Sequence, residues 1–306
     1  MSKPVAYLEG KYVPLEDAKI SIMTHAFLYG TACFEGIRAY WNEDDKQLYV
    51  FRLLEHFKRM KNSTKITRIF LEQSAEELSE ITLELLRKSD FRGNDVYIRP
   101  VAYKSGLGIG VKLTGIENNF CCFATEYGKY IDTSKGLKVA VSSWAHVEDN
   151  CIPMRAKVNG AYINAAYAKS EALDNGYDEA IFMNRDGHVS EGSAENFFMV
   201  REGKLVTPSV SSHILEGITR DTLMKLAAEE MGVTCVERVV DRSELYICEE
   251  AFICGTGAEL APIVSVDRVP VGDGKVGPIA KELQSLYYDV VRGKNKKYMK
   301  WCTPVF

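Results

Sequence analysis

The segment from Glu191 to Arg220 constrains what this chain can fold into more than any other stretch. It has the pattern of a strand edge that carries Glu191, a hairpin that closes near Gly203, and a glycine-containing turn over residues 215–220. Apolar residues then repeat at helical spacing over residues 221–232, where a final glycine ends the predicted helix. A glycine just before a helix lets backbone N–H groups point at an anion, and the helix dipole favours a phosphate there.

A carboxylate at one end of this segment and an anion-binding helix N-terminus at the other suit a cofactor with a cationic ring nitrogen and a phosphate. Pyridoxal 5′-phosphate is such a cofactor. The segment contains the spacings Glu191-x-Ser193-x-x-Asn196-Phe197-Phe198, Leu205-x-Thr207 and Leu215-x-Gly217-Ile218-x-Arg220. Together these spacings resemble the signature of the class IV, fold-type IV, aminotransferases. Local structure alone would favour a β-hairpin followed by a surface helix, so the identification rests on the whole pattern.

The resemblance implies an α+β fold with two domains. A smaller N-terminal α/β domain would precede a larger C-terminal domain with a pseudo-barrel sheet, and the cofactor would lie between them. The length of 306 residues allows two cores. Residues 126–136 are polar, contain two glycines and form the best candidate linker. We therefore expect an N-terminal domain over residues 1–125 and a cofactor-binding domain over residues 137–306.

The composition limits the kinds of binding partner that can be expected. A formal net charge of −4 gives no reason to expect nucleic acid or an anionic membrane as a partner. No apolar run approaches the roughly 20 residues that cross a bilayer, and the eight cysteines show no metal-ligand spacing. We expect a cytoplasmic protein that binds no metal and acts on small molecules.

Local patterns predict several elements of the N-terminal half. A hairpin is expected over residues 4–14, and an apolar stripe of Leu53, Phe57 and Met60 predicts a helix. A capping box at residues 74–77 begins a second helix that runs to about residue 89. Residues 96–103 alternate as in a strand, with Tyr97 and Arg99 on one face. The aromatic-rich segment 20–40 is expected to lie mostly in the core sheet.

The catalytic amine follows from the resemblance. An aminotransferase needs an amine that holds an aldehyde as a Schiff base and then moves a proton, and lysine does this when its surroundings lower its pKa. The position that matches is Lys157, which follows Ile152-Pro153 and precedes Asn159-Gly160. An isolated lysine would be interpreted as a surface residue. The match implies a ping-pong transamination through Lys157.

The resemblance also implies the residues that bind the cofactor. Glu191 would stabilise the protonated ring nitrogen, Tyr162 would donate to the ring O3′, and Leu215 would pack against the ring. Arg59 would bind two phosphate oxygens with its guanidinium, although a helix arginine of this kind is usually solvated. The other residues expected to hold the phosphate are Ile218 and Thr219, through their backbone amides, and Thr256.

Within class IV, several motifs resemble the branched-chain aminotransferases. They are Phe34-Glu35-Gly36-Ile37-Arg38, Tyr97-Ile98-Arg99-Pro100, Glu191-Gly192-x-x-Glu195-Asn196 and Gly255-Thr256-x-Ala258-Glu259. They imply that leucine, isoleucine and valine react with 2-oxoglutarate. The residues expected to bind these substrates are Tyr29, Phe34, Arg38, Tyr97, Arg99, Tyr127, Tyr130, Gly257 and Ala258.

Other interpretations remain open at this point. Arg99 fits a salt bridge inside a sheet as well as it fits a substrate carboxylate. D-amino-acid aminotransferases, R-selective amine transaminases and aminodeoxychorismate lyases share the fold, and a homologue that binds no cofactor is a further alternative. Glu216 stands where the branched-chain family often has proline. The family also implies a homo-oligomer, either a dimer or a hexamer.

Overall fold

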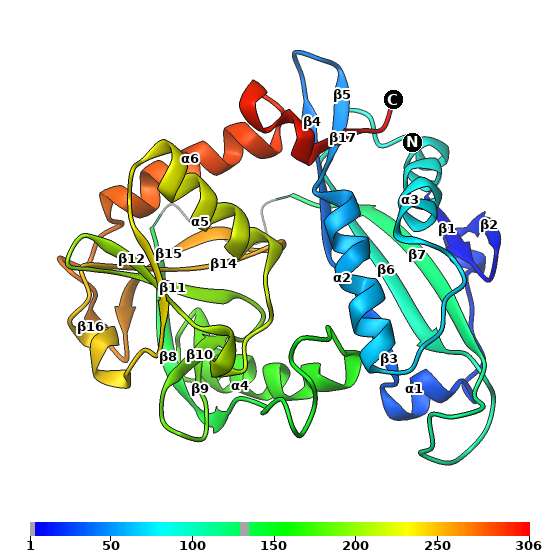
Figure 1. The fold of residues 1–306 in the computed structure, drawn as a ribbon, viewed down its shortest axis with the longest axis horizontal. Coiled ribbons are helices and arrows are strands. Elements are labelled where there is room, and N and C mark those ends of the chain that lie inside the picture. The colour runs from blue at the N-terminus through cyan, green and yellow to red at the C-terminus, as the bar shows by residue number, and fades with distance from the viewer. Residues whose placement is uncertain (1–3, 129–134) are drawn as a thin grey trace. The chain divides into compact units, whose positions relative to one another are not determined.

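The computed structural model describes residues 4–128 and 135–306, and the chain forms two compact units (Figure 1). Unit 1 comprises Met1–Gly128, Ala156–Gly160 and Asp289–Phe306, and unit 2 comprises Lys129–Arg155 and Ala161–Tyr288. Each unit therefore draws on segments from more than one part of the sequence. The division into domains at residues 1–125 and 137–306 remains a prediction.

Unit 1 is built on an antiparallel sheet. Its strands are β1 (Val5–Leu8), β2 (Lys11–Pro14), β3 (Ala32–Phe34), β4 (Ile37–Asn42), β5 (Gln47–Phe51), β6 (Val96–Lys104), β7 (Asn118–Glu126) and β17 (Cys302–Pro304). Its helices are α1 (His25–Tyr29), α2 (Leu53–Ile66), α3 (Ala75–Ser89) and the 3₁₀ helices η1 (Leu15–Asp17) and η5 (Lys296–Trp301). Within the described residues the order is β17-β5-β4-β6-β7-β1-β2, with β3 paired to β6. Helices α2 and α3 pack on each other, and α3 also contacts β1 and β7 (Figure 1).

The hairpin, the apolar helix stripe and the capping box predicted for this unit can each be located in the structure. The first hairpin turns at Glu9 and Gly10, both with positive φ, which matches the twist of the two strands. The predicted apolar stripe on α2 is buried in the core. Ser74 accepts a hydrogen bond from the Glu77 N–H at 3.1 Å, and the Glu77 carboxylate accepts one from the Ser74 N–H at 2.7 Å. The predicted capping box is thus confirmed.

The expectation for residues 20–40 is only partly confirmed. Strands β3 and β4 do lie in the sheet, but residues 25–29 form the short helix α1. Ile22 is 77% exposed and Phe27 is 65% exposed. Aromatic and apolar content alone therefore misplaced the first third of this segment in the core.

Unit 2 is built on a mixed sheet. Its strands are β8 (Leu137–Ala145), β9 (Glu179–Met183), β10 (Val189–Gly192), β11 (Asn196–Arg201), β12 (Lys204–Pro208), β13 (Cys235–Arg238), β14 (Glu250–Gly255), β15 (Glu259–Val266) and β16 (Val269–Pro270). Its helices are α4 (Tyr162–Asp174), α5 (Ile218–Glu230) and the 3₁₀ helices η3 (Val210–Ser212) and η4 (Arg242–Tyr246). Helix α6 (Pro278–Val291) and η2 (Asn159–Ala161) each contain residues of both units.

The sheet of unit 2 has the order β10-β9-β8-β15-β14-β11-β12-β13 in the part of the chain that the structure describes, with β16 paired to β15. Strand β8 is parallel to β9 and β15, and β12 is parallel to β13. Helix α4 contacts β8 and β9, and α5 contacts β13 and β14. The chain therefore has the expected α+β architecture, and α5 begins directly after Gly217, in the glycine-containing turn that the sequence predicts.

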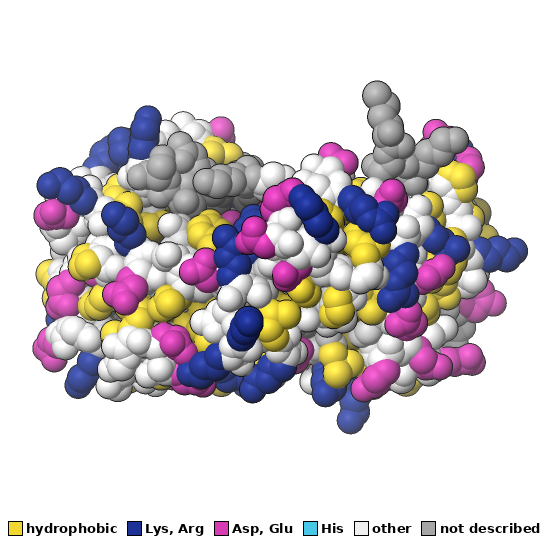
Figure 2. All heavy atoms as spheres, turned by 90° about the horizontal axis from the view of Figure 1, so that it is seen from above, with side chains coloured by type: hydrophobic (Ala, Val, Ile, Leu, Met, Phe, Trp, Pro, Cys, Tyr) yellow, Lys and Arg dark blue, Asp and Glu magenta, His cyan; other side chains and the backbone are white. Residues whose placement is uncertain are grey.

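The surface carries charges of both signs. Acidic and basic side chains are interspersed on the face drawn in Figure 2. Across residues 4–128 and 135–306, helices of the length and hydropathy needed to cross a membrane are absent. The same residues contain no group of three or more histidine, cysteine or acidic side chains placed to hold a metal ion.

Candidate active site

The segment that carries Lys157 is tied to unit 1 by backbone hydrogen bonds. The Phe34 N–H donates to the Lys157 carbonyl at 3.0 Å, and the Gly160 N–H donates to the Gly30 carbonyl at 3.2 Å. The Lys157 N–H donates to the Ser63 hydroxyl at 3.2 Å. A Cβ on Gly30 would lie only 2.8 Å from the Gly160 Cα, so the two chains meet closely there. This anchoring places the lysine next to β3.

The ring of Phe34 lies near two cationic side chains. The Lys157 Nζ lies 5.0 Å from the ring centroid, and the Arg99 Cζ lies 4.2 Å from it. The Tyr97 hydroxyl accepts a hydrogen bond from Arg99 Nη2 at 2.8 Å. Arg99 Nε is buried without a hydrogen-bond partner among the described residues. Among the described residues, Arg99 forms no salt bridge with a carboxylate of the sheet. Its guanidinium can therefore donate hydrogen bonds to an anion.

Other predicted substrate residues gather around Tyr97. Its ring lies 5.0 Å from that of Tyr127, and a Cβ on Gly36 would lie 2.3 Å from its hydroxyl oxygen. The Arg38 guanidinium donates to the Tyr127 carbonyl at 3.3 Å and lies 5.3 Å from the Tyr127 ring centroid. Gly36 is therefore needed for the close approach of Tyr97.

The predicted substrate residue Tyr29 contacts His25 and a loop of unit 1. The Tyr29 hydroxyl accepts a hydrogen bond from the Gly110 N–H at 2.9 Å, and its ring lies 4.8 Å from that of His25. Tyr29 thus contacts the loop before β7. Tyr130 lies outside the described residues.

Arg59 is paired with the buried Glu35, a residue of the 34–38 motif for which the sequence predicts no role. Arg59 Nε donates to Glu35 Oε1 at 2.8 Å, and Arg59 Nη2 donates to Glu35 Oε2 at 2.7 Å. His56 Nδ1 lies 2.8 Å from Glu35 Oε2. The Glu35 side chain is fully buried. No local pattern could have found this pair, because its members lie on different elements.

The charge state of this cluster follows from its surroundings. Burial by itself would raise the pKa of Glu35, but the charge and hydrogen bonds of Arg59 and His56 outweigh it and lower the pKa to about 2. Burial lowers the pKa of His56, and Glu35 only partly offsets this. At neutral pH the cluster therefore contains an ionised glutamate, a guanidinium and a neutral imidazole.

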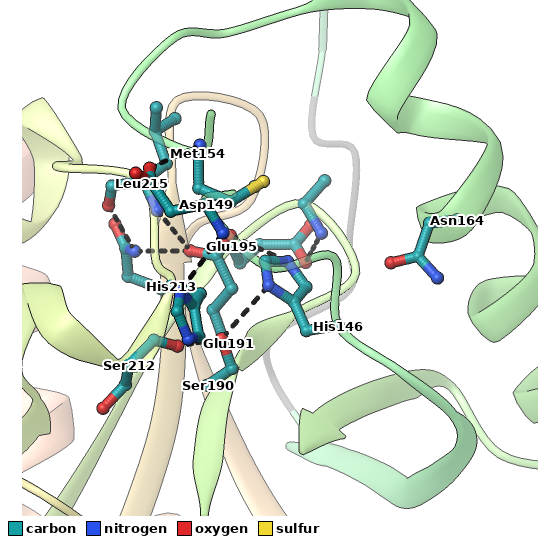
Figure 3. A network of polar contacts seen from close by, with 12 residues as sticks. His146, Asp149, Met154, Asn164, Ser190, Glu191, Glu195, Ser212, His213 and Leu215 are labelled. Atoms are coloured by element: carbon teal, nitrogen blue, oxygen red, sulfur yellow. Dashed lines mark hydrogen bonds and ion pairs between the residues drawn. The ribbon is translucent and has the colours of Figure 1, made fainter. Parts of the chain in front are cut away.

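In unit 2, Glu191 on β10 lies in a hydrogen-bonded network (Figure 3). Its Oε2 accepts hydrogen bonds from Asn196 Nδ2 at 2.8 Å and from the Leu215 N–H at 3.2 Å. Its Oε1 lies 3.4 Å from His146 Nε2 (Figure 3). The carboxylate is mostly buried, with 9% of its side chain exposed. These contacts fix the position of the Glu191 carboxylate within unit 2.

Asn196 links Glu191 to the turn that begins α5. Asn196 Nδ2 also donates to the Leu215 carbonyl at 2.9 Å. A Cβ on Gly217 would lie 2.0 Å from Asn196 Oδ1, whereas the φ of Gly217 is an ordinary −72°. Glycine is therefore required at this position for space and not for an unusual backbone. The sequence pattern contained Asn196, but its role as a link was not predicted.

The N-terminus of α5 has the character of an anion site. Its N-cap is Gly217, and no side chain caps it. Ile218 and Thr219 begin the helix, so their N–H groups belong to its first turn, the part of a helix that favours an anion. Glu216, which replaces the usual proline, forms an ion pair with Arg155 at 3.3 Å that is about half exposed. Such exposed pairs contribute little.

The remaining predicted cofactor and substrate residues lie at the ends of elements in unit 2. Thr256, Gly257 and Ala258 form the loop of the hairpin between β14 and β15, in which Gly255 pairs with Glu259. Tyr162 is the first residue of α4 and is half-buried.

Glu195 is a second buried carboxylate near Glu191, and the sequence reasoning gave it no role. Burial raises its pKa to about 8, and the negative charges of Glu179 and Glu191 add to the effect. A hydrogen bond from the Ala194 N–H at 3.0 Å only partly opposes this. Glu195 is therefore predominantly protonated at pH 7.

The donor set fits pyridoxal 5′-phosphate. Taken separately, unit 1 contains an amine and a guanidinium, and unit 2 contains a buried carboxylate and a helix that begins at Gly217. These are the groups that an aldehyde, a phosphate and a protonated ring nitrogen require.

Comparison with known proteins gives a consistent result. Residues 32–266 match the family model described as amino-transferase class IV. The chain is 51% identical, over 100% of its own length and 98% of the other, to a probable branched-chain-amino-acid aminotransferase of Aquifex aeolicus (strain VF5). It resembles the branched-chain aminotransferase of Thermoproteus uzoniensis crystallised with norvaline, with a TM-score of 0.94, 41% identity and 99% of each chain covered. It also resembles that of Thermobaculum terrenum in its PLP form, with a TM-score of 0.95, 38% identity and 100% of each chain covered.

Proposed function

This chain belongs to the class IV aminotransferase family, and on that premise we propose that it transfers the amino group of branched-chain L-amino acids to 2-oxoglutarate. It uses pyridoxal 5′-phosphate as its cofactor. The products are branched 2-oxo acids and glutamate, formed by a ping-pong mechanism. Relatives of this chain at up to 51% identity carry the name of this activity.

The observation that carries the proposal is the position of Phe34 close to two cationic side chains. Its ring lies 5.0 Å from the amine of Lys157 and 4.2 Å from the guanidinium carbon of Arg99. The amine and a cation that could bind a carboxylate thus both lie beside the same aromatic ring. That surface suits a branched apolar side chain, and the cation suits an acidic one.

Different side chains of this protein would bind different parts of the cofactor. When bound, pyridoxal phosphate supplies an aldehyde that accepts the amino group and a ring that withdraws electrons. Lys157 would hold the cofactor through its amine and would move the proton at the substrate Cα. Glu191 would keep the ring nitrogen protonated, and Tyr162 would donate to the ring hydroxyl oxygen. Leu215 would pack against the ring, and Arg59, Ile218, Thr219 and Thr256 would hold the phosphate.

The substrate site must accept leucine and 2-oxoglutarate in turn. Burying the second carboxylate of 2-oxoglutarate without a partner is too costly, so a cation must be within reach. Arg99 has a buried Nε without a partner among the described residues, and its remaining contacts are with Tyr97 and Phe34. Arg38, Tyr29, Tyr97, Tyr127, Tyr130, Gly257 and Ala258 complete the proposed substrate site.

We also propose that the enzyme is a cytoplasmic homo-oligomer. Apolar side chains of residues 22–28 and of the loop over residues 107–111 support the oligomer, because Ile22, Phe27 and Ile109 are 77%, 65% and 91% exposed. The two segments lie together, since the Gly108 N–H donates to the Met23 carbonyl at 3.3 Å. Apolar surface of this kind is typical of an interface between subunits.

Arg99→Ala tests the function directly. The half-reaction with glutamate or 2-oxoglutarate should slow far more than the half-reaction with leucine, because only the acidic substrate needs the cation. Truncating one member of a buried charge pair typically costs about 2–5 kcal/mol, which sets the expected difference between the two substrates. Single-turnover rates for each half-reaction measure it.

The matched control is Arg92→Ala, which removes an exposed arginine of the same unit that pairs with Asp90. It should leave both half-reactions unchanged. Equal losses for both substrates in Arg99→Ala would contradict the proposed role of Arg99. Failure of the wild-type protein to react with leucine would contradict the proposed substrate class.

A further inference from the structure

The contacts of Arg59 restrict how it can bind an anion. A guanidinium has N–H groups on Nε and on both Nη atoms, arranged in one plane. Glu35 takes the Nε–H and one N–H of Nη2, at 2.8 and 2.7 Å. This bidentate pairing fixes both the position of the guanidinium and the direction of its plane. The Nη1 edge then faces away from Glu35.

Glu35 itself is held in place from several sides. Its Oε2 lies 2.8 Å from His56 Nδ1, and because an ionised carboxylate only accepts, His56 must be the donor. The Glu35 N–H donates to the Pro100 carbonyl at 3.0 Å, which ties the residue to β6. The carboxylate is fully buried and cannot exchange its partners for water. The orientation of Arg59 is thus set by a rigid contact from another part of unit 1.

We propose that Glu35, supported by His56, is a positioning residue that holds the Arg59 guanidinium in the orientation in which it binds the cofactor phosphate. This inference rests on the proposed role of Arg59 in the function described above. Glu35 does not touch the cofactor in this proposal. It acts because a fixed guanidinium loses less conformational entropy when it binds a phosphate than a mobile one does.

The opposing explanation is that Glu35 only neutralises a buried arginine and supports the fold. The two explanations differ in their consequence for the phosphate. If Glu35 only supports the fold, changing it would weaken the binding of every form of the cofactor to the same extent. If Glu35 positions Arg59, changing it would selectively weaken the binding of pyridoxal 5′-phosphate. The affinity for pyridoxal, which lacks the phosphate, would be nearly unaffected.

The experiment measures the affinity ratio of pyridoxal 5′-phosphate to pyridoxal by exchanging the bound cofactor of the holoenzyme against free pyridoxal at equilibrium. Glu35→Gln places an amide N–H against a donor of Arg59 or His56, and Glu35→Asp keeps the charge but is one methylene shorter. Both should lower the ratio on the order of 10-fold, as is typical when a residue that orients a ligand-binding side chain is lost. Circular dichroism verifies that each variant is folded.

The matched control is Glu55→Gln. Glu55 is on the same helix as Arg59 and pairs with Arg52 at 3.0 Å. It should leave the affinity ratio unchanged. Arg59→Gln tests the premise and should lower the ratio at least as much as the Glu35 variants. If Arg59→Gln leaves the ratio unchanged, the proposed role of Arg59 fails, and this inference fails with it.

Other outcomes overturn the inference alone. A normal or increased ratio in both Glu35 variants, with a lowered ratio in Arg59→Gln, would show that Glu35 does not position the guanidinium. An equal loss of affinity for both ligands would show that Glu35 only stabilises the fold. Loss of the folded state in both Glu35 variants, while Arg59→Gln remains folded, would do the same.

Discussion

Glu35 and Glu195 show at the residue scale that burial alone does not decide the charge of a carboxylate. Both are buried, and in both burial raises the pKa. Glu35 has the guanidinium of Arg59 and the ring of His56 as donors, and its pKa falls to about 2. Glu195 has one backbone donor and lies near other carboxylates, so its pKa rises to about 8. The difference lies in the partners that the fold brings to each side chain.

The raised pKa of Glu195 predicts a pH-dependent stability. A carboxyl group whose pKa is higher in the folded than in the unfolded state favours folding fully below the unfolded value of 4.5. That contribution is lost as the pH rises from about 4.5 to about 8. Glu195→Gln cannot ionise, so its free energy of unfolding relative to wild type should increase between pH 5 and pH 9 by at least about 1 kcal/mol.

Urea unfolding at pH 5, 7 and 9 measures this trend. Glu282→Gln, which changes an exposed glutamate of α6 in the same unit, is the control and should show no such increase. A constant difference between Glu195→Gln and wild type across this pH range would contradict the prediction.

At the scale of elements, the start of α5 depends on a contact with β11. The helix has an apolar face that the sequence reveals, but its first turn is positioned by Asn196, which binds both Glu191 and the Leu215 carbonyl. The space for that amide exists only because residue 217 is glycine. The Glu191 carboxylate and the turn that begins α5 are therefore one connected structure.

Gly217→Ala should disrupt this connection. The added methyl would lie 2.0 Å from Asn196 Oδ1, so the amide must move and lose its hydrogen bonds. Overpacking of this kind costs roughly 1–3 kcal/mol in the free energy of unfolding, measured by urea denaturation. The double variant with Asn196→Ala removes the clash, so Gly217→Ala should cost much less in that background. Equal costs in both backgrounds would show that the contact does not matter.

At the scale of the whole molecule, segments remote in sequence complete unit 1. The lysine segment Ala156–Gly160 belongs to it, as does the C-terminal tail. Strand β17 pairs with β5, and the Val305 N–H donates to the Leu48 carbonyl at 3.0 Å. Arg87 Nε donates to the Val305 carbonyl at 2.8 Å. The tail thus covers an edge of the sheet that would otherwise be unpaired.

Val305→Ala tests the contribution of the tail. Val305 is 2% exposed within the core of unit 1. Removing its two methyl groups should cost roughly 1.5 kcal/mol in the free energy of unfolding, at about 0.8 kcal/mol for each buried carbon. Thr303→Ala, two residues earlier on β17 and only half-buried, is the matched control and should cost less. Equal effects in urea unfolding would show that the tail does not pack as described.

The sequence by itself determined the features that depend on neighbouring residues. Helices α2 and α3, the capping box at Ser74, the first hairpin and the motif that contains Glu191 all follow from periodicity, turn residues and fixed spacings. These signals are local because helical and turn hydrogen bonds join residues only a few positions apart.

Only the tertiary structure decided which distant residues meet. The pairing of Glu35 with Arg59, the link from Asn196 to the start of α5, and the closure of the first sheet by residues 302–304 have no local signature. The short helix α1 with its exposed apolar side chains was misplaced in the core for the same reason. Apolar content alone does not determine whether a side chain faces the interior or the solvent, because burial depends on what the rest of the chain packs against it.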